Sequence, residues 1–190
     1  MSNRRKTNNS AKEVKIELRK KVVEAIDKEF ISVLDAFGGS GFLWKTMKLT
    51  EERKIEVLSI DKYNKKADIR GENLKVIPSL DLSRFDIIDL DSYGCPYNQI
   101  KAVVKNKTLA NHTYIIYTYI VTGMGGANRD MLEEFGISRS MVKEAPTLFK
   151  EEQQKIFNGF LYKCGVKKVD EACISDNTSK KRYGYFVYPE

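Results

Sequence analysis

The stretch ISVLDAFGGSG, residues 31–41, decides the fold class that we expect for this chain. Its first five residues include Ile31, Val33 and Leu34 and have the composition of a short buried strand. The strand runs directly into a turn with three glycines, and residues 42–49 are expected to continue as a helix. A strand that passes through a glycine turn into a helix is the opening unit of an α/β fold.

The rest of the chain continues this alternation of strands and helices. Further strands are expected at residues 56–60, 67–70, 85–90 and 113–121, and helices at residues 14–26, 96–105 and 149–161. Strands that alternate with helices form a parallel sheet wound by right-handed crossovers. The end of the chain differs, because strands at 166–174 and 182–188 flank turn residues 176–179 and predict an antiparallel hairpin. The expected fold is therefore α/β, a doubly wound Rossmann-like sheet with a C-terminal antiparallel hairpin.

Positive charge is concentrated at the N-terminus. Residues 1–21 hold eight Lys or Arg against two Glu, whereas the remaining chain has 25 basic and 24 acidic residues. We expect two parts, a basic arm and helix at residues 1–30 and the α/β domain at residues 31–190. The helix is expected to dock its apolar side and to leave its basic side exposed. Such an arm suits a nucleic-acid backbone, since each neutralised phosphate releases counterions, although a solubilising tail has the same composition.

Cysteine usage and hydropathy bear on location. Cys95, Cys164 and Cys173 show no metal-ligand spacing, and His112, the one histidine, stands at the start of an expected strand with no partner in sight. No stretch reaches the roughly 18 apolar residues of a membrane span, and the polar, basic start is unlike a secretory signal. These features predict a cytoplasmic protein with reduced thiols, no membrane association and no metal.

The glycine turn is the first candidate binding site. Gly39 and Gly41 supply the first two glycines of the GxGxxG pattern of dinucleotide sites, but Trp44 stands where the third would pack helix on strand. Asp35, which ends the strand, suits a ligand with an ammonium group better than a pyrophosphate. The stretch resembles motif I of the S-adenosylmethionine-dependent methyltransferases. Asp61 ends the second strand, where a carboxylate can bind both ribose hydroxyls.

The stretch DLDSYGCP, residues 89–96, follows the fourth strand, at the sheet edge where α/β proteins bind ligands. It resembles motif IV of amino-methylating nucleic-acid enzymes and is most similar to the tRNA dimethylguanosine methyltransferase family, whose pattern there is D-x-D-P-(F/Y)-G-S-P. The residues that match are Asp89, Asp91, Tyr93, Gly94 and Pro96. A hairpin at the end of the sheet likewise distinguishes the methyltransferase form of the fold from the nicotinamide-binding form.

This resemblance implies S-adenosyl-L-methionine as the cofactor and an amino group of a nucleic-acid base as the target. Asp91 would accept hydrogen bonds from that amino group and relay its proton, and Tyr93 would stack on an extruded or single-stranded base. Ser92, Pro96 and Arg129 are further candidate substrate residues. The candidate cofactor residues follow the first four strands: Asp35, Phe37, Gly38, Gly39, Gly41, Asp61, Glu72, Asn73 and Asp89.

Three departures from the family pattern leave alternatives open. Ser92 replaces the usual proline and Cys95 replaces a serine, and the hairpin is not followed by the large C-terminal domain of that family. A protein partner could then supply target specificity. RNA is favoured over DNA as the substrate, but DNA is not excluded. The alternatives are a non-catalytic nucleic-acid-binding protein that keeps the fold, a small-molecule methyltransferase, and carbon-5 methylation with Cys95 as nucleophile.

Overall fold

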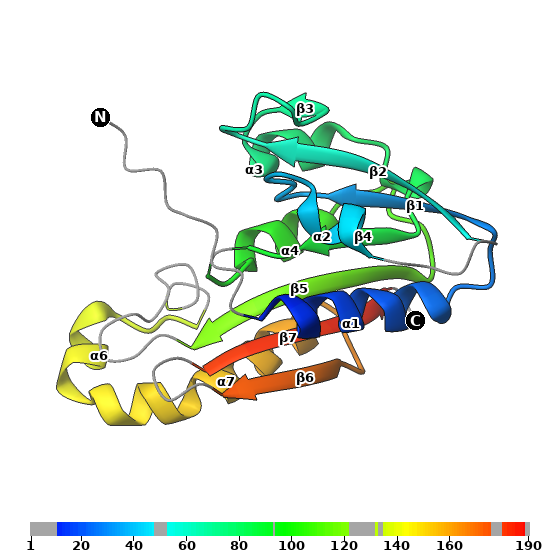
Figure 1. Cartoon of the computed structure of the whole chain (residues 1–190). Coiled ribbons are helices and arrows are strands. Elements are labelled where there is room, and N and C mark those ends of the chain that lie inside the picture. The colour runs from blue at the N-terminus through cyan, green and yellow to red at the C-terminus, as the bar shows by residue number, and fades with distance from the viewer. Residues whose placement is uncertain are drawn as a thin grey trace.

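The computed structural model describes residues 11–47, 53–92, 94–121, 132, 135–175 and 180–188. Figure 1 shows the alternation of helices and strands along the chain. The strands are β1 (Phe30–Asp35), β2 (Lys54–Asp61), β3 (Ile69–Arg70), β4 (Ile87–Leu90), β5 (Thr113–Val121), β6 (Asp170–Ser175) and β7 (Lys180–Tyr188). The helices are α1 (Lys12–Glu24), α2 (Phe42–Thr46), α3 (Asn73–Val76), α4 (Tyr97–Val104), α6 (Arg139–Glu144) and α7 (Pro146–Lys163), with 3₁₀ turns at Ile77–Ser79 and Leu82–Arg84. Within the described residues, none of the helices has the length and hydropathy of a bilayer span.

The strands form one sheet in the order β3-β2-β1-β4-β5-β7-β6. The first five strands in this order run parallel to one another. β7 runs antiparallel to β5 along its whole length, from the pair Thr113–Tyr188 to the pair Val121–Lys180, and β6 runs antiparallel to β7. The predicted doubly wound sheet with a C-terminal antiparallel pair is therefore confirmed. The turn expected at residues 176–179 lies outside the described residues.

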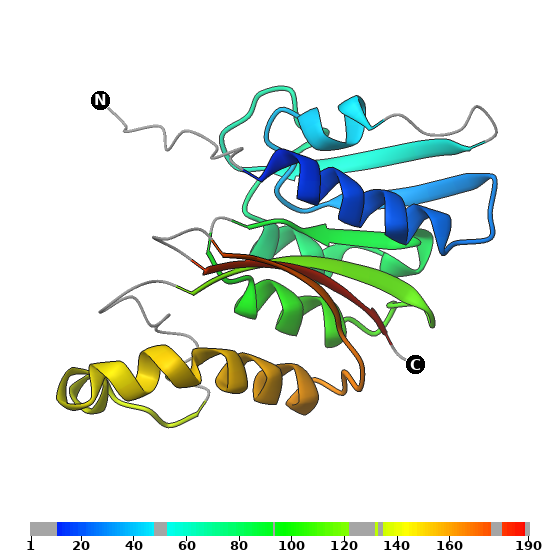
Figure 2. The same ribbon diagram turned by 60° about the horizontal axis from the view of Figure 1, so that its bottom comes forward.

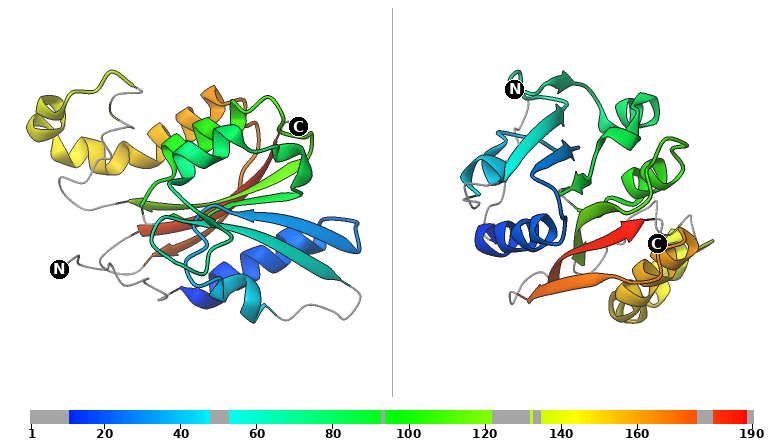
Figure 3. Two further views of the ribbon diagram at one scale, coloured as in Figure 1. Left: turned by 90° about the horizontal axis from the view of Figure 1, so that it is seen from above. Right: turned by 90° about the vertical axis from the view of Figure 1, so that its right-hand side faces the viewer.

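Helices cover both faces of the sheet (Figures 2 and 3). α1 and α2 lie on one face, and α3, α4 and α7 lie on the other. Successive residues of the central strands point to opposite faces, as strand geometry requires. Leu34 and Ile88 are buried with the residues of α4 and α7, whereas Val33 and Ile87 are buried with the residues of α1. The domain is thus a three-layer sandwich with an apolar core on each side of the sheet.

Several elements differ in extent from their prediction, and three of them are shorter for a clear local reason. α2 ends at Thr46, short of the predicted residue 49, because the backbone of Met47 is extended, with φ −71° and ψ 115°. β3 is shorter than residues 67–70, because Asp68 uses its carboxylate to accept a hydrogen bond from the N–H of Ser59 at 2.8 Å. β6 begins later than residue 166, because the N–H of Val166 bonds back to the last turn of α7.

Candidate functional site

The carboxyl ends of the parallel strands meet at one edge of the sheet. β1 and β2 end at Asp35 and Asp61, and β4 ends at Leu90. β2 and β3 extend the sheet from one side of β1, whereas β4 and β5 extend it from the other side (Figure 1). The strand order therefore reverses between β1 and β4. Open α/β sheets bind their ligands outside the carboxyl ends of the strands at such a switch point.

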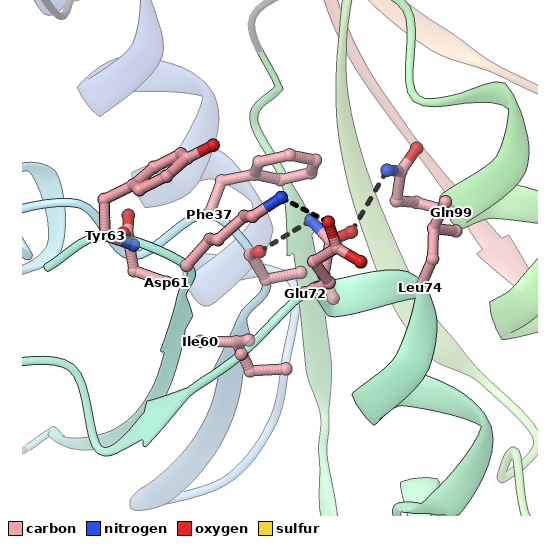
Figure 4. Close-up of a pocket in the computed structure, with 11 residues that line it drawn as sticks. Phe37, Ile60, Asp61, Tyr63, Glu72, Leu74 and Gln99 are labelled. Carbon is pink, nitrogen blue, oxygen red and sulfur yellow. Dashed lines mark hydrogen bonds and ion pairs between the residues drawn. The ribbon is translucent and has the colours of Figure 1, made fainter. Parts of the chain in front are cut away.

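A pocket of about 390 Å³ opens at this edge beside β1 and β2. Figure 4 shows that Phe37 and Tyr63 reach it from the loops after β1 and β2, and that Gln99 reaches it from the first turn of α4. Small-molecule and cofactor pockets are commonly of about this size. The pocket brings together four of the predicted cofactor residues: Phe37, Asp61, Glu72 and Asn73.

Backbone donors fix the Asp61 carboxylate at the wall of this pocket. Its Oδ1 accepts hydrogen bonds from the N–H groups of Tyr63 and Asn64, both at 2.7 Å. Its Oδ2 accepts a hydrogen bond from the N–H of Gly39 at 3.0 Å, which ties the end of β2 to the glycine turn after β1. A carboxylate has about four lone-pair sites, so Asp61 keeps acceptor capacity for the hydroxyl groups of a ligand.

Two side-chain amides also line the pocket, and one of them, Gln99, lies across from Tyr63 (Figure 4). Asn73 Nδ2 donates to the carbonyl oxygen of Ala36 at 3.1 Å, and Gln99 Nε2 donates to Asn73 Oδ1 at 3.1 Å. Because amides both donate and accept hydrogen bonds, these two can recognise the polar edge of a heterocycle. Glu72 instead forms an ion pair with Lys62, and the hydrogen bond from Lys62 lowers the pKa of its exposed carboxyl.

The glycines of the turn serve different purposes. A Cβ at Gly38 would lie 2.6 Å from the Cβ of Ser59, so glycine is required there by the close packing of the turn on β2. Gly39 and Gly41 have φ values of 48° and 68°, which side chains disfavour. Both line a second pocket of about 350 Å³ together with Trp44. The structure therefore gives Gly38 a packing role and places Gly39 and Gly41 outside the lining of the first pocket.

Charged side chains are buried together behind the ends of β1 and β4. Arg19 of α1 is 2% exposed, and its Nε donates to Asp89 Oδ2 at 2.9 Å. Arg19 Nη2 also lies 3.2 Å from Asp91 Oδ2, and Lys15 Nζ donates to Asp91 Oδ1 at 2.8 Å. We call this group the buried charge cluster, which consists of Lys15, Arg19, Asp35, Asp89 and Asp91.

The three carboxyl groups of the cluster share two cations. The pKa is raised for two of these carboxyl groups and lowered for the third. Burial, and then the charge of nearby Asp89, raises the pKa of Asp35 to about 8. Burial likewise raises the pKa of Asp89. Burial alone would also raise the pKa of Asp91, but the charges of Arg19 and Lys15 outweigh it and hold that pKa below its ordinary value. At neutral pH Asp91 is therefore ionised and Asp35 carries a proton.

The docking of α1 corrects one expectation from the sequence. The basic side of this helix was expected to be exposed, yet Lys15 and Arg19 are both buried. The reason is that Asp89 is fully buried and Asp91 largely buried at the end of β4, where a carboxylate needs a counter-ion. Lys21 also has a partner, because its Nζ lies 2.6 Å from Asp170 Oδ2 at the surface.

The stretch DLDSYGCP connects β4 to α4. The Ser92 hydroxyl is buried and has no hydrogen-bond partner among the described residues, which is uncommon for a buried polar group. Pro96 precedes the first turn of α4, and Cys95 packs, partly buried, against the core. The predicted catalytic residue Tyr93 and the predicted substrate residue Arg129 lie outside the described residues.

The sequence did not indicate several residues of the site. Gln99 and Tyr63 line the pocket, and the start of α4 at the carboxyl edge was a signal that could have pointed to Gln99. Trp44 was considered only as a misfit for a glycine, but its Nε1 donates to Asp89 Oδ2 at 2.8 Å. Arg19 and Lys15 had no local signal, since their partners are 70 or more residues away in sequence.

Comparisons with known proteins show similarity of fold. Neither a protein-family model nor a curated protein sequence matches this chain. A putative class I S-adenosylmethionine-dependent methyltransferase from Listeria monocytogenes matches with a TM-score of 0.56 and 13% identity, over 98% of this chain and 62% of that one. Trm1 from Pyrococcus horikoshii, in complex with S-adenosyl-L-methionine, matches with a TM-score of 0.54 and 14% identity. The match covers 95% of this chain and 56% of that one. A phosphoethanolamine N-methyltransferase from Haemonchus contortus, in complex with phosphomonomethylethanolamine and S-adenosylhomocysteine, matches with a TM-score of 0.56 and 10% identity. This match covers 93% of this chain and 52% of that one.

This chain has the Rossmann-like methyltransferase fold. It spans about half the length of the H. contortus enzyme and of a carbon methyltransferase, CurJ, which it matches with a TM-score of 0.56. Proteins named for carbon and for nitrogen methylation thus share this architecture. Because one fold hosts different reactions, the residues of the site must carry the argument about chemistry.

Proposed function

We propose that this chain is an S-adenosylmethionine-dependent methyltransferase that acts on an amino group of a nucleic-acid base. The observation that carries the proposal is the placement of two features at one switch point of this fold. One is the pocket with Asp61 and Asn73, which suits a nucleoside, and the other is the ionised Asp91 next to the buried Ser92 hydroxyl. Complexes of similar folds with S-adenosylmethionine or S-adenosylhomocysteine support the choice of cofactor.

The residues of the pocket fit the adenosine part of that cofactor. Asp61 would accept hydrogen bonds from the ribose hydroxyls, and Asn73 and Gln99 would meet the polar edge of adenine. S-adenosylmethionine, when bound, supplies a methyl group on a cationic sulfonium. The protonated Asp35 has a raised pKa, so it would lose its proton more readily with a cation nearby and thereby compensate the added charge.

We assign Asp91 to the amino group of the substrate. Asp91 is ionised at neutral pH and accepts hydrogen bonds. Lys15 and Thr118 both donate to its Oδ1, and Arg19 donates to its Oδ2, so Oδ2 keeps one acceptor position for an N–H of the substrate. This orients the nitrogen so that its lone pair points away from the carboxylate. A carboxylate with a lowered pKa is a weak base, so Asp91 positions the nitrogen and passes its proton on to water rather than retaining it.

The charges around Asp91 favour a neutral amino group over an aliphatic ammonium ion. Lys15 and Arg19 already lie 2.8 Å and 3.2 Å from the carboxylate oxygens. Both would repel a third cation at this position, whereas the amino group of a base is neutral and needs only an acceptor. This argument, with the DLDSYGCP stretch, supports tRNA or another RNA over a small amine. A protein partner that supplies target specificity remains part of the proposal.

The test is incubation of the purified chain with tritiated S-adenosylmethionine and, in separate reactions, with tRNA, rRNA, DNA or phosphoethanolamine. We expect label in a nucleic-acid pool, with RNA preferred over DNA. Label in phosphoethanolamine alone would replace the proposal with a small-molecule methyltransferase. Binding of RNA or DNA without label in any pool would favour a non-catalytic nucleic-acid-binding protein.

A further inference from the structure

Two segments of the chain contain lysines and no acidic residue. They are residues 94–112 and residues 153–169, and neither contains a single Asp or Glu. The near neutrality of the chain beyond residue 21 hides this separation of charge, since acidic residues elsewhere balance the total. The lysines of the two segments are Lys101, Lys105, Lys107, Lys155, Lys163, Lys167 and Lys168, and we call them the α4–α7 lysine face.

The fold brings the two segments together on one side of the sheet. The first segment contains α4 and the second contains the C-terminal part of α7, and these helices lie side by side (Figures 2 and 3). The Tyr97 ring packs between them, with its centroid 4.5 Å from that of Phe160 and 5.6 Å from that of Phe157. Because the aromatic side chains fill the contact and the core beneath it, the lysines are left at the surface. All except Lys101 are exposed.

Both helices end at the edge of the sheet where β5 and β6 begin, which is opposite to the carboxyl edge of the parallel strands. α4 leads to β5 and α7 leads to β6, and these two strands run in the same direction because each is antiparallel to β7. Lys105 and Lys107 at the end of α4 therefore come to the same edge as Lys167 beyond α7. None of these three lysines forms an ion pair with another described residue. Their charges are available to a polyanion.

An exposed aromatic side chain accompanies these lysines. Tyr162 lies near the end of α7 next to Lys163 and is 77% exposed, the largest value for a big apolar side chain in the described part of the chain. A tyrosine in this position does not contribute to the core. Lysines with an exposed aromatic ring are the combination that binds single-stranded nucleic acid, through phosphates and base stacking.

The face of the sheet that α1 covers has fewer positive charges available to a polyanion. In α1, Lys15 and Arg19 neutralise Asp89 and Asp91, and Lys21 pairs with Asp170. These cations are used within the fold. Among the described residues, the charge complementarity to a polyanion is therefore better on the face formed by α4 and α7.

We propose that the α4–α7 lysine face is the docking surface for a single-stranded segment of nucleic acid, with its lysines on phosphates and Tyr162 on a base. The inference rests on the proposed function, since it assigns the substrate's binding surface. α4 begins directly after the DLDSYGCP turn. A nucleic-acid strand bound along this helix therefore leads to the edge of the sheet where Asp91 lies.

The experiment measures binding of a fluorescein-labelled oligoribonucleotide of about 20 nucleotides to the full chain over a range of salt concentrations. The test variant combines Lys105→Gln, Lys107→Gln and Lys167→Gln. The matched control combines Lys54→Gln, Lys65→Gln and Arg70→Gln, which removes three exposed charges at the β2–β3 edge of the sheet. The salt slope is the slope of log affinity against log salt concentration. Loss of three phosphate contacts should make this slope shallower by about 2, which corresponds to roughly 100-fold weaker binding at 0.1 M salt. The control should stay within about threefold of the wild type.

A separate variant, Tyr162→Leu, tests the stacking contact. It should weaken binding roughly tenfold without changing the salt slope, because it removes a ring and no charge. Equal losses in the lysine variant and its control, or no binding by the wild-type chain, would overturn the proposal. The readout is binding and needs neither cofactor nor turnover. If the lysine variant loses binding while no pool accepts methyl groups, the surface stands and the proposed reaction fails.

Discussion

Arg19 Nε of helix α1 donates a hydrogen bond to Asp89 Oδ2 at the end of β4, at 2.9 Å and across 70 residues of sequence. Both side chains are almost completely buried. The contact makes α1 a part of the candidate site, because the same guanidinium reaches Asp91 at 3.2 Å. The division into an N-terminal part at residues 1–30 and a domain at 31–190 remains a prediction, but Lys15 and Arg19 couple the two parts electrostatically.

The first prediction concerns this counter-ion. Arg19→Met should destabilise the fold by about 3–5 kcal/mol, because it leaves two buried carboxylates with one cation. Urea titration followed by circular dichroism measures the loss. Lys21→Met is the matched control, since Lys21 is a cation of the same helix whose ion pair with Asp170 is exposed, and it should have little effect. Equal stability of the two variants would show that the buried pair is not required.

The second prediction concerns truncation of the N-terminus. Deletion of residues 1–9 removes Arg4, Arg5 and Lys6 and should leave the described fold intact. If those charges bind phosphates, the slope of log affinity against log salt for RNA should become shallower by about 2. Deletion of residues 1–21 should instead unfold the chain, because it also removes Arg19. An unchanged salt slope after the short deletion would identify the segment as a solubility tail.

The third prediction is a pH dependence of stability that comes from Asp35. Its pKa is about 8 in the folded chain and about 4 in an unfolded one, so the folded state binds the extra proton. The contribution of this group to stability is therefore greatest below pH 4 and falls as the pH rises toward 8. Asp35→Asn removes this loss, so its Tm relative to the wild type should increase steadily between pH 5 and pH 8.5.

The lowered pKa of Asp91 does not interfere with that measurement. It changes stability in the opposite sense, but only in acid, where Asp91 becomes protonated. Thermal melts in steps of half a pH unit are sufficient. A Tm difference between Asp35→Asn and the wild type that is constant over the whole range would mean that Asp35 is ionised at neutral pH.

The fourth prediction tests the nucleoside pocket. Asp61→Ala should weaken binding of S-adenosylhomocysteine at least tenfold, because it removes hydrogen bonds from a carboxylate and releases the glycine turn. Gly39→Val should act in the same direction, since φ is 48° at this position. Isothermal titration calorimetry measures both. No detectable binding to the wild-type chain would refute the cofactor assignment.

The fifth prediction separates amino methylation from carbon-5 methylation. Asp91→Asn should lower the rate of methyl transfer by roughly 10²–10⁴-fold while cofactor binding survives, because the carboxylate acts on the substrate. Cys95→Ser should stay active, since it restores the residue of the resembling family. Melting curves of Asp91→Asn are needed as a control, because Lys15 and Arg19 lose a partner. An inactive Cys95→Ser with an active Asp91→Asn would reverse the assignment.

The sequence alone was sufficient for the order of the strands and for several polar residues that line the pocket. Residues 113–121 were predicted as a strand and form β5, because a run of β-branched and aromatic residues is a local signal. Asp61, Glu72 and Asn73 were predicted as pocket residues, and they line it because polar residues after successive parallel strands arrive at one edge of the sheet.

Tertiary structure decided which charges meet. No local pattern could show that Lys15 and Arg19 neutralise Asp91 and Asp89, since these partners are separated by 70 residues or more and attract one another only once α1 docks on the sheet. The α4–α7 lysine face arose in the same way, from two segments that become neighbours through Tyr97 and Phe160. Hydrophobic period and turn chemistry act between near neighbours and can be read from the sequence, whereas electrostatic partners are set by distance in space.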